Sequence, residues 1–193
     1  MSLEKTKLET TSLETVRLSL FPCLPAQLLA LMEDPERFEE MAGFPASPGL
    51  CEMFGSEEVL AEISPEWLAA LRVSEGPDPW RYGYFIVRRA TGIERLNGAA
   101  IGTAGFKGPP DESGMVEIAY GVAPEFRGQG YATEAATTLV AFAFDTAGVE
   151  LVRAHTLPVP NASTRVLTKC GFRHVGEVVD PDDGPVWRWE RSR

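Results

Sequence analysis

A chain of 193 residues with 44% hydrophobic content is long enough to form a globular domain with a sizeable core. Its formal net charge of -10 at pH 7 argues against a nucleic-acid partner, because phosphate backbones attract basic surfaces, and it would attract a cationic amine. The 3 cysteines lack Cys-x-x-Cys spacing, so neither a disulfide framework nor a zinc site is indicated. No apolar leader and no run of membrane-spanning length is visible, and we therefore expect a cytoplasmic protein without a membrane partner.

The first half of the chain mixes strand and helix patterns. The polar residues 1–13 predict a flexible tail ahead of a single domain over residues 14–193. Alternating apolar residues predict a strand over residues 15–21. The expected elements that follow are helices at 26–32 and 35–41, a loop at 42–55, and a helix capped by Ser56 that restarts at Pro65 and ends near residue 73.

The second half predicts most of the sheet. Strands are expected at 82–89, 99–106, 115–122, 151–157, 172–179 and 185–190, with helices at 128–146 and from Asn161 or Ser163 to 169. A helical crossover separates the strands at 115–122 and 151–157, so these two should run parallel, whereas short turns make the other pairs antiparallel. The expected fold is α/β (α+β), with a mixed, mostly antiparallel twisted sheet of about six or seven strands flanked by helices.

The stretch from Met115 to Thr133 joins a strand to a helix through the turn Arg-Gly-Gln-Gly-Tyr-Ala. The first amides of a helix have no intrahelical acceptor and lie at the positive end of the helix dipole, so this turn suits an anion such as phosphate. Gly128 and Gly130 would let a ligand approach the backbone, and Arg127 would add charge. The glycines could equally serve a tight bend alone. The spacing fits neither the dinucleotide fingerprint nor a P-loop.

The turn resembles the pyrophosphate-binding turn of the GNAT superfamily of acyl-CoA-dependent N-acyltransferases, whose pattern is Arg/Gln-x-x-Gly-x-Gly/Ala. Arg127, Gly130 and Ala132 occupy those three places. A second stretch, from Asn161 to Phe172, is similar to the late helix of that family and its Lys-x-Gly-Phe exit. The segments Glu14-Thr-x-Arg-Leu and Glu117-Ile-x-Tyr look most like the branch of ribosomal-protein and amino-acid N-acetyltransferases.

This resemblance implies a particular cofactor site. In the superfamily the two parallel strands, here at 115–122 and 151–157, splay apart into a wedge that holds the pantetheine arm of acetyl-CoA. Acetyl-CoA is then the expected co-substrate, and no metal is expected, since His155 and His174 lie on separate predicted strands without further ligands. The cofactor-binding residues that we expect are Val122, Arg127, Gly128, Gln129, Gly130, Tyr131, Ala132, Thr133 and Asn161.

Acyl transfer to an amine needs a base for the ammonium, a donor for the developing oxyanion and an acid for the departing thiolate. Glu117 is the predicted base, because it is a carboxylate in an otherwise apolar strand that leads straight to the cofactor turn. The alternatives for Glu117 are a solvated face of the strand or an ion pair with an arginine. Amides around Val122 are the expected donors for the thioester carbonyl.

The predicted acid rests on the resemblance. Many GNAT enzymes carry a tyrosine two residues before the lysine of the exit motif, and this chain has Leu167 there. A serine near the start of the late helix has the acid role in the ribosomal-protein branch, and Ser163 matches it when counted back from Lys169, whereas Thr164 is a rival when counted forward from Asn161. Both hydroxyls could equally be helix caps, as could Asn161.

The sequence therefore predicts an N-acetyltransferase that acts by direct attack of a primary amine. A protein or peptide N-terminus is the leading acceptor, with a small-molecule amine such as an amino acid, polyamine or antibiotic as the alternative. A non-catalytic acyl-CoA-binding module is a rival of another class. The acceptor is expected to be chosen by residues 26–80, and the protein is expected to be a monomer or a homodimer.

Overall fold

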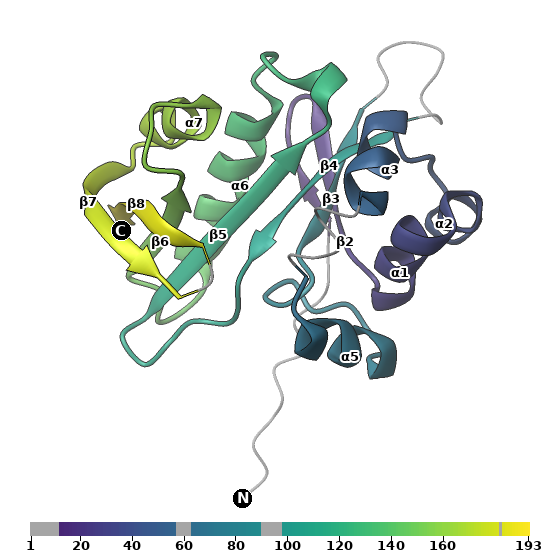
Figure 1. Cartoon of the computed structure of the whole chain (residues 1–193), viewed down its shortest axis with the longest axis horizontal. Coiled ribbons are helices and arrows are strands. Elements are labelled where there is room, and N and C mark those ends of the chain that lie inside the picture. Colours follow the sequence, from purple (N-terminus) through teal and green to yellow (C-terminus); the bar gives the residue numbers. More distant parts are fainter. Residues whose placement is uncertain (1–11, 57–62, 90–97, 182) are drawn as a thin grey trace, which may run out of the picture.

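The computed structural model of this chain describes residues 12–56, 63–89, 98–181 and 183–193. These residues contain an 8-stranded sheet with the strand order β1-β2-β3-β4-β5-β6-β8-β7 (Figure 1). Neighbouring strands are antiparallel except β5 and β6, which are parallel. The prediction of a mixed, mostly antiparallel sheet with one parallel pair is confirmed.

The strands correspond closely to the predicted ones. They are β1 (Leu13–Glu14), β2 (Leu18–Pro22), β3 (Tyr84–Arg88), β4 (Ala100–Phe106), β5 (Met115–Val122), β6 (Leu151–Thr156), β7 (Arg173–Asp180) and β8 (Gly184–Ser192). Strand β1 was not predicted, because two residues are too few to show a period. Most of the predicted tail lies outside the described residues, and the division into a tail and a single domain stays a prediction.

The start of the first long strand was placed too early. Val16 is 92% exposed, and the amide of Thr15 donates to the carbonyl of Leu18 at 2.9 Å, which closes a turn before β2 begins. The alternation over residues 15–21 was therefore misleading at its first positions. This turn directs the side chain of Arg17 away from the sheet core and towards the first turn of α6.

The helices are α1 (Pro25–Glu33), α2 (Pro35–Ala42), α3 (Pro48–Gly55), α5 (Pro65–Val73), α6 (Tyr131–Asp145) and α7 (Ala162–Lys169), with a 3₁₀ turn η1 (Pro124–Phe126). The prediction of a loop over residues 42–55 is wrong in its second part, because α3 forms there. Ser47 caps that helix by accepting from the amide of Leu50 at 3.4 Å, and Pro48 takes the first helical position, where its missing N–H costs nothing. The helix predicted to begin at Ser56 lies largely outside the described residues.

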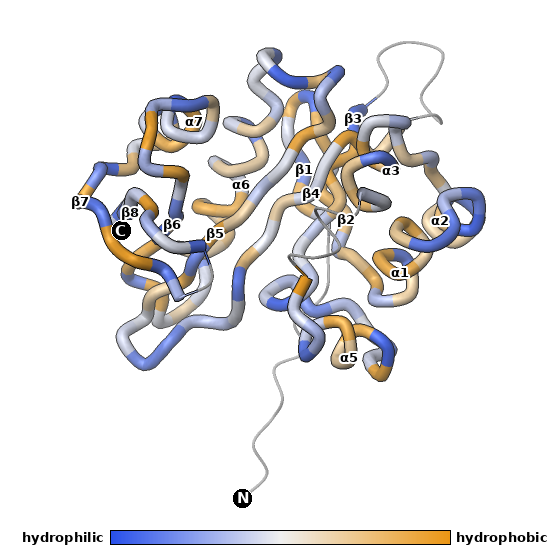
Figure 2. The backbone as a smooth tube through the Cα atoms, viewed as in Figure 1, coloured by the Kyte–Doolittle hydropathy of each residue, from blue (hydrophilic) through white to orange (hydrophobic). Residues whose placement is uncertain are grey.

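The sheet is covered on both faces, and each face has its own core. Alternate residues of β3 divide between them: Tyr84 and Ile86 pack with α6 and α7, whereas Phe85 and Val87 pack with α1, α3 and α5. Figure 1 shows α6 and α7 on one side and the four earlier helices gathered on the other. Figure 2 shows the hydrophobic stretches along the central strands and α1, whereas α2 is largely hydrophilic.

The parallel pair is short. Strand β5 pairs with β6 only through Met115, Val116 and Glu117, which face Leu151, Val152 and Arg153. Beyond Glu117 the two strands separate, while β5 continues to pair with β4 on its other edge as far as Val122. The sheet therefore opens into a gap next to the second half of β5.

Candidate active site

The turn before α6 is held in a conformation that requires glycine. Gly128 and Gly130 have φ angles of 74° and 85°, in the left-handed region that other residues resist. Residues 127–130 are exposed, and Gly130 is the N-cap of α6 with no side chain bonded over the helix end. The first amides of a 15-residue helix are thus presented to solvent at the positive end of its dipole.

Arg17 braces this turn from the first strands. Its Nε donates to Glu134 Oε2 at 2.8 Å and its Nη1 donates to the carbonyl of Gln129 at 3.0 Å. The guanidinium also lies 4.7 Å from the ring centre of Tyr131. Glu134 accepts further bonds from Thr15 Oγ1 and the Arg17 amide, so one carboxylate ties the chain before β2 to the first turn of α6.

The strand edge beside the gap offers backbone donors. The amide of Ala123 donates to the carbonyl of Ile101 at 2.8 Å, towards β4. Because successive amides of a strand point to opposite edges, those of Val122 and Tyr120 point towards the gap. Arg127 Nε donates to the carbonyl of Val122 at 3.0 Å, which joins the Gly-rich turn to this edge.

The predicted cofactor residues are thus arranged along one path. Val122 lies on the open strand edge, residues 127–130 form the exposed turn, and Ala132 and Thr133 follow in the first turn of α6. Tyr131 is 8% exposed, so its side chain offers little surface to a cofactor. A polar chain with amide groups could bond the strand edge while a diphosphate meets the helix start, and the residues present therefore fit coenzyme A.

A cavity of about 580 Å³ lies where β5 and β6 separate. It is lined by Lys107, Glu117, Ile118, Ala119, Tyr120, Ala154, His155, Thr156, Leu157, Ser163, Asp183 and Val186. Both residues predicted to be catalytic, Glu117 and Ser163, are therefore brought together on one cavity although they are 46 positions apart in the sequence.

Glu117 forms the centre of a charged row across the sheet. Its Oε1 lies 2.8 Å from Lys107 Nζ and 3.1 Å from His155 Nδ1, and its side chain is 16% exposed. The row continues to β8, where Arg188 Nε lies 3.4 Å from His155 Nε2. The predicted alternative of an ion pair is present, but the cation is a lysine rather than an arginine.

The two candidate acids at the start of α7, Ser163 and Thr164, have different surroundings. Thr164 Oγ1 donates to the carbonyl of Asn161 at 2.9 Å and accepts from its amide at 3.1 Å, and Asn161 Oδ1 accepts from the amide of Thr164 at 3.0 Å. Thr164 and Asn161 thus cap the helix reciprocally. Ser163, by contrast, lines the cavity, and Leu167 is fully buried in the core.

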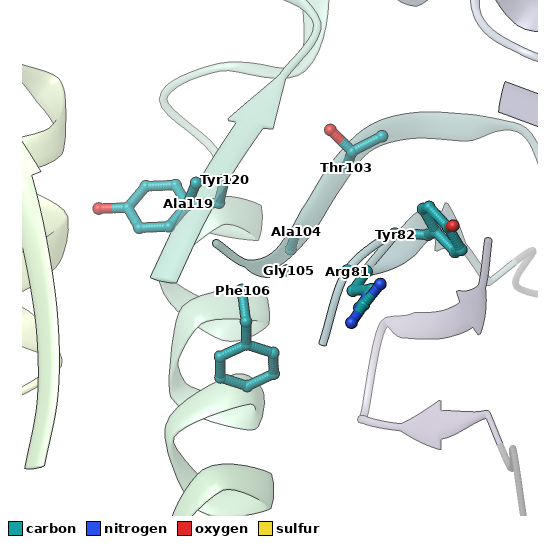
Figure 3. Close-up of a pocket in the computed structure, with 9 residues that line it drawn as sticks. Arg81, Tyr82, Thr103, Ala104, Gly105, Phe106, Ala119 and Tyr120 are labelled. Atoms are coloured by element: carbon teal, nitrogen blue, oxygen red, sulfur yellow. The ribbon is translucent and has the colours of Figure 1, made fainter. Parts of the chain in front are cut away.

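Tyr120 joins the large cavity to a smaller one. Its hydroxyl lies 3.5 Å from the carbonyl of Ser163, and burial raises the pKa of Tyr120 above its ordinary value. The smaller cavity, of about 250 Å³, is shown in Figure 3, where the Tyr120 ring points away from Arg81 and Tyr82. Because both cavities share Ala119 and Tyr120, they form adjoining spaces on the two sides of β5's second half.

Sequence reasoning missed Lys107 and Tyr120, and it considered His155 only as a metal ligand. The register supplies the signal in retrospect: Glu117 faces Arg153, so His155 lies two residues further on the same face of β6. Likewise, the amide of Lys107 donates to the carbonyl of Glu117, which makes them cross-strand neighbours.

The part of the chain that the structure describes contains no cluster of three or more His, Cys, Asp or Glu side chains that could hold a metal ion. The free thiols of Cys23, Cys51 and Cys170 are not paired with one another. No helix among the described residues has the length and apolar composition that crossing a bilayer requires.

Comparison with known proteins agrees with this geometry. A family model for an acetyltransferase (GNAT) domain matches residues 22–173. The chain is 38% identical over 69 residues to the FsC-acetyl coenzyme A-N(2)-transacetylase of Aspergillus fumigatus, a match that covers 36% of this chain and 29% of that protein. It is 34% identical over 80 residues to the uncharacterized N-acetyltransferase YjdG of Bacillus subtilis, covering 42% of this chain and 48% of that protein. The chain thus matches less than half the length of these curated relatives.

Solved structures share the fold across nearly the whole chain. A GNAT-family acetyltransferase from Bacillus anthracis has a TM-score of 0.60 at 16% identity, covering 94% of this chain and 98% of that one. RimL, a ribosomal-protein alpha-N-acetyltransferase in complex with coenzyme A, has a TM-score of 0.59 at 16% identity with the same coverage. An aminoglycoside acetyltransferase, also with coenzyme A, has a TM-score of 0.52 at 21% identity, covering 91% and 95%. With a matching family model over most of its length, this chain belongs to the GNAT family of acetyl-CoA-dependent N-acetyltransferases.

Proposed function

We propose that this protein transfers the acetyl group of acetyl-CoA to a primary amine by direct attack in a ternary complex. The observation that carries the proposal is the meeting of Glu117, His155 and Ser163 on one cavity at the point where β5 and β6 separate. A partly buried carboxylate and imidazole in contact, beside an open strand edge, provide the base and the donors that amine acylation needs.

Acetyl-CoA would be held along the path from the strand edge to the helix start. Residues 127–130 and the first amides of α6 would bind the diphosphate, with the Arg127 guanidinium as an added charge. The amide of Val122 would hold the pantetheine arm or the thioester carbonyl, and Asn161 would offer its side-chain N–H groups while its oxygen caps α7. The co-substrate supplies the activated thioester, and the chain supplies orientation.

Glu117 is the proposed base. The amine must lose a proton before it attacks, and Glu117 lines the cavity with a side chain that is 16% exposed. His155 contacts Glu117 Oε1 and its other ring nitrogen accepts from Arg188, so it would orient the carboxylate.

The developing oxyanion and the departing thiolate need hydrogen-bond donors. The amides of Val122 and Tyr120 point into the gap and would donate to the developing oxyanion. Ser163 is the proposed acid for the departing thiolate, and its rival Thr164 is engaged in the cap of α7 through both hydroxyl bonds. The Tyr120 hydroxyl, whose pKa is raised by burial, donates to the Ser163 carbonyl at 3.5 Å, and it would be a second donor to the thiolate once it turns from this long bond.

A peptide N-terminus is the proposed acceptor. The support comes from the shape: beyond Tyr120 the smaller cavity adds about 250 Å³ of space, which gives room for residues that follow the reacting amine. The large cavity is lined by two carboxylates, Glu117 and Asp183, and one lysine, Lys107, and this acidic excess favours a cationic amine. A compact amine such as an amino acid, polyamine or antibiotic is the alternative, because it would fill the large cavity alone.

The test combines binding and turnover. Calorimetric titration with acetyl-CoA should give micromolar binding that Arg127→Ala and Gly130→Glu weaken, and thiol release should then be screened with N-terminal peptides and small amines. Glu117→Gln should lose turnover and keep cofactor affinity. Binding without turnover on any amine would instead favour the non-catalytic acyl-CoA-binding module, and absence of binding by folded protein would refute the proposal.

A further inference from the structure

Lys107 places an amine of the chain itself inside the proposed transfer site. It follows β4, lines the cavity of about 580 Å³, and its Nζ lies 2.8 Å from Glu117 Oε1. That oxygen belongs to the residue that our proposed function makes the base. A primary amine in contact with the base of an amine acetyltransferase is in the position that an acceptor has to reach.

The position of Lys107 beside Glu117 is fixed by strand pairing as well as by the side-chain contact. The amide of Lys107 donates to the carbonyl of Glu117 at 2.9 Å, so the two residues are cross-strand neighbours on one face of the sheet. The lysine side chain is 50% exposed and has a flexible four-carbon stem, so its Nζ can swing within the cavity without movement of the backbone.

We propose that Lys107 is an acceptor of this enzyme, so that the protein acetylates its own Lys107 when acetyl-CoA is bound and no other amine fills the cavity. This rests on the proposed function. It makes Lys107 a modification site and predicts that the cavity accepts a lysine side chain as an acyl acceptor.

The chemistry balances with groups already present. Glu117 takes one proton from the Lys107 ammonium, and the free amine attacks the thioester carbonyl. A carbon–nitrogen bond forms, the nitrogen loses a second proton, and the carbon–sulfur bond breaks. That second proton reaches the departing thiolate through Ser163 or water, so coenzyme A leaves as the thiol, and the proton held by Glu117 is released to solvent. The products are an uncharged acetyl-lysine and free coenzyme A, and no oxidant or reductant is needed.

The charges around Lys107 set the pH dependence. Burial acts to lower the pKa of Lys107, but the hydrogen bond and charge of Glu117 on β5, with Asp180 and Asp183 at the β7–β8 turn, outweigh it and raise the pKa. His155 on β6 contacts the same Glu117 oxygen. The ammonium form of Lys107 therefore dominates at neutral pH. The rate of self-acetylation should rise with pH, because a larger fraction of Lys107 is then the free amine.

Mass spectrometry of the full chain tests this proposal. The chain is incubated with acetyl-CoA without any added amine and digested at intervals. The lysines of the chain are Lys5, Lys7, Lys107 and Lys169, so the exposed Lys169 on α7 is an internal reference for uncatalysed acetylation. Lys107 should gain one acetyl group at least about tenfold faster than Lys169. The rate should saturate with acetyl-CoA and should not depend on protein concentration, as expected for transfer within one molecule.

Variants separate catalysis from simple reactivity. Glu117→Gln should slow acetylation of Lys107 by about a hundredfold, and Arg127→Ala should raise the acetyl-CoA concentration needed for half the maximal rate. Lys169 should be unaffected in both. Equal acetylation of Lys107 and Lys169, or acetylation of Lys107 that is unchanged in Glu117→Gln, would overturn the inference.

A parallel thiol-release assay with added amines distinguishes the two proposals. If the protein acetylates an added amine while Lys107 stays unmodified in the absence of that amine, the self-acetylation inference fails and the proposed function stands. If neither an added amine nor Lys107 is acetylated by protein that binds acetyl-CoA, both fail.

Discussion

Glu117 and His155 act as one unit at the residue scale. The contact of 3.1 Å between Glu117 Oε1 and His155 Nδ1 places the imidazole beside the proposed base, and Arg188 Nε donates to its other ring nitrogen, Nε2, at 3.4 Å. The imidazole is thus held on both nitrogens. An oriented carboxylate loses less conformational freedom when the acceptor binds, so the contact should contribute to the chemical step more than to binding.

His155→Ala should therefore lower kcat about tenfold or more while KM for acetyl-CoA stays nearly constant. Loss of the imidazole removes the orienting contact but leaves the Gly-rich turn intact. Steady-state kinetics with the best acceptor would measure this. His155→Asn is the matched control, because its amide can still donate to Glu117 and should recover part of kcat; an equal loss in both variants would contradict an orienting role.

At the scale of elements, the junction between β5 and α6 is the part of the site that the sequence predicted best. Strand, turn and helix are local patterns, and the left-handed angles of Gly128 and Gly130 agree with glycine at both places. The partners of Glu117 could not be predicted in the same way. Lys107 and His155 meet it only through strand registers, which depend on the whole sheet.

The errors also have local physical causes. Helix α3 was missed because its glycine and proline content is typical of loops, although Ser47 followed by Pro48 is a helix start. The first long strand was begun too early because Val16 continued an apolar alternation that the turn at Thr15 interrupts. In each case a hydrogen bond between nearby residues overrode the pattern.

Gly130→Ala should affect binding, and Gly43→Ala should not. Both glycines have left-handed φ angles, 85° and 76°, so each substitution should lower the free energy of unfolding by about 1–2 kcal/mol. A Cβ at Gly130 would lie 3.4 Å from Arg17 Nη2, at the turn proposed to bind the diphosphate, whereas one at Gly43 meets nothing within 4 Å. Calorimetric titration should show weaker acetyl-CoA binding only for Gly130→Ala; equal affinities would argue against the turn as the binding site.

The hydrogen bonds of Glu134 that help to hold the turn before α6 should be sensitive to acid. Burial acts to raise the pKa of Glu134, but the hydrogen bonds from Thr15 and Arg17 and the Arg17 charge outweigh it and lower the pKa. A carboxyl whose pKa is lower in the folded state stabilises the fold fully above its unfolded pKa of about 4.3. This stabilisation is lost as the pH falls through the lower folded value.

Glu134→Gln should therefore lower the free energy of unfolding by about 2 kcal/mol at pH 7 and by much less near pH 3. Urea unfolding at several pH values would measure the difference. Glu150→Gln, at an exposed carboxylate before β6, is a suitable control and should change little at either pH. A loss in Glu134→Gln that is equal at both pH values would contradict the linkage.

For the whole molecule, the sheet divides two separate cores, and α6 belongs to the core that carries the site. Leu139 lies on α6, is fully buried and packs in the cluster that reaches from β2 to α7. Both cores depend on β3, whose residues are buried on each face. The site is thus positioned by packing that involves most of the described chain rather than by one loop.

Leu139→Ala should lower the free energy of unfolding by about 2–5 kcal/mol, because it removes buried methyl groups and leaves a cavity. Val73→Ala, at a position that is 82% exposed at the end of α5, should change it by less than about 0.5 kcal/mol. Thermal or urea unfolding compares the two. Similar small effects in both variants would mean that the core around α6 can repack.

The short parallel pairing has a mechanical consequence. Antiparallel ladders join strands β2 to β5 and join strands β6, β8 and β7, and each of these ladders is longer than the one between the two halves. Between the halves, β5 and β6 pair only through Met115, Val116 and Glu117. The sheet therefore consists of two rigid halves joined by one short ladder. We expect the C-terminal half, made of β6, β8 and β7, to open as a cooperative unit before the rest. Acetyl-CoA bound between β5 and β6 would hold the two halves of the sheet together. Hydrogen exchange measured with and without acetyl-CoA should therefore show the largest increase in protection along β6.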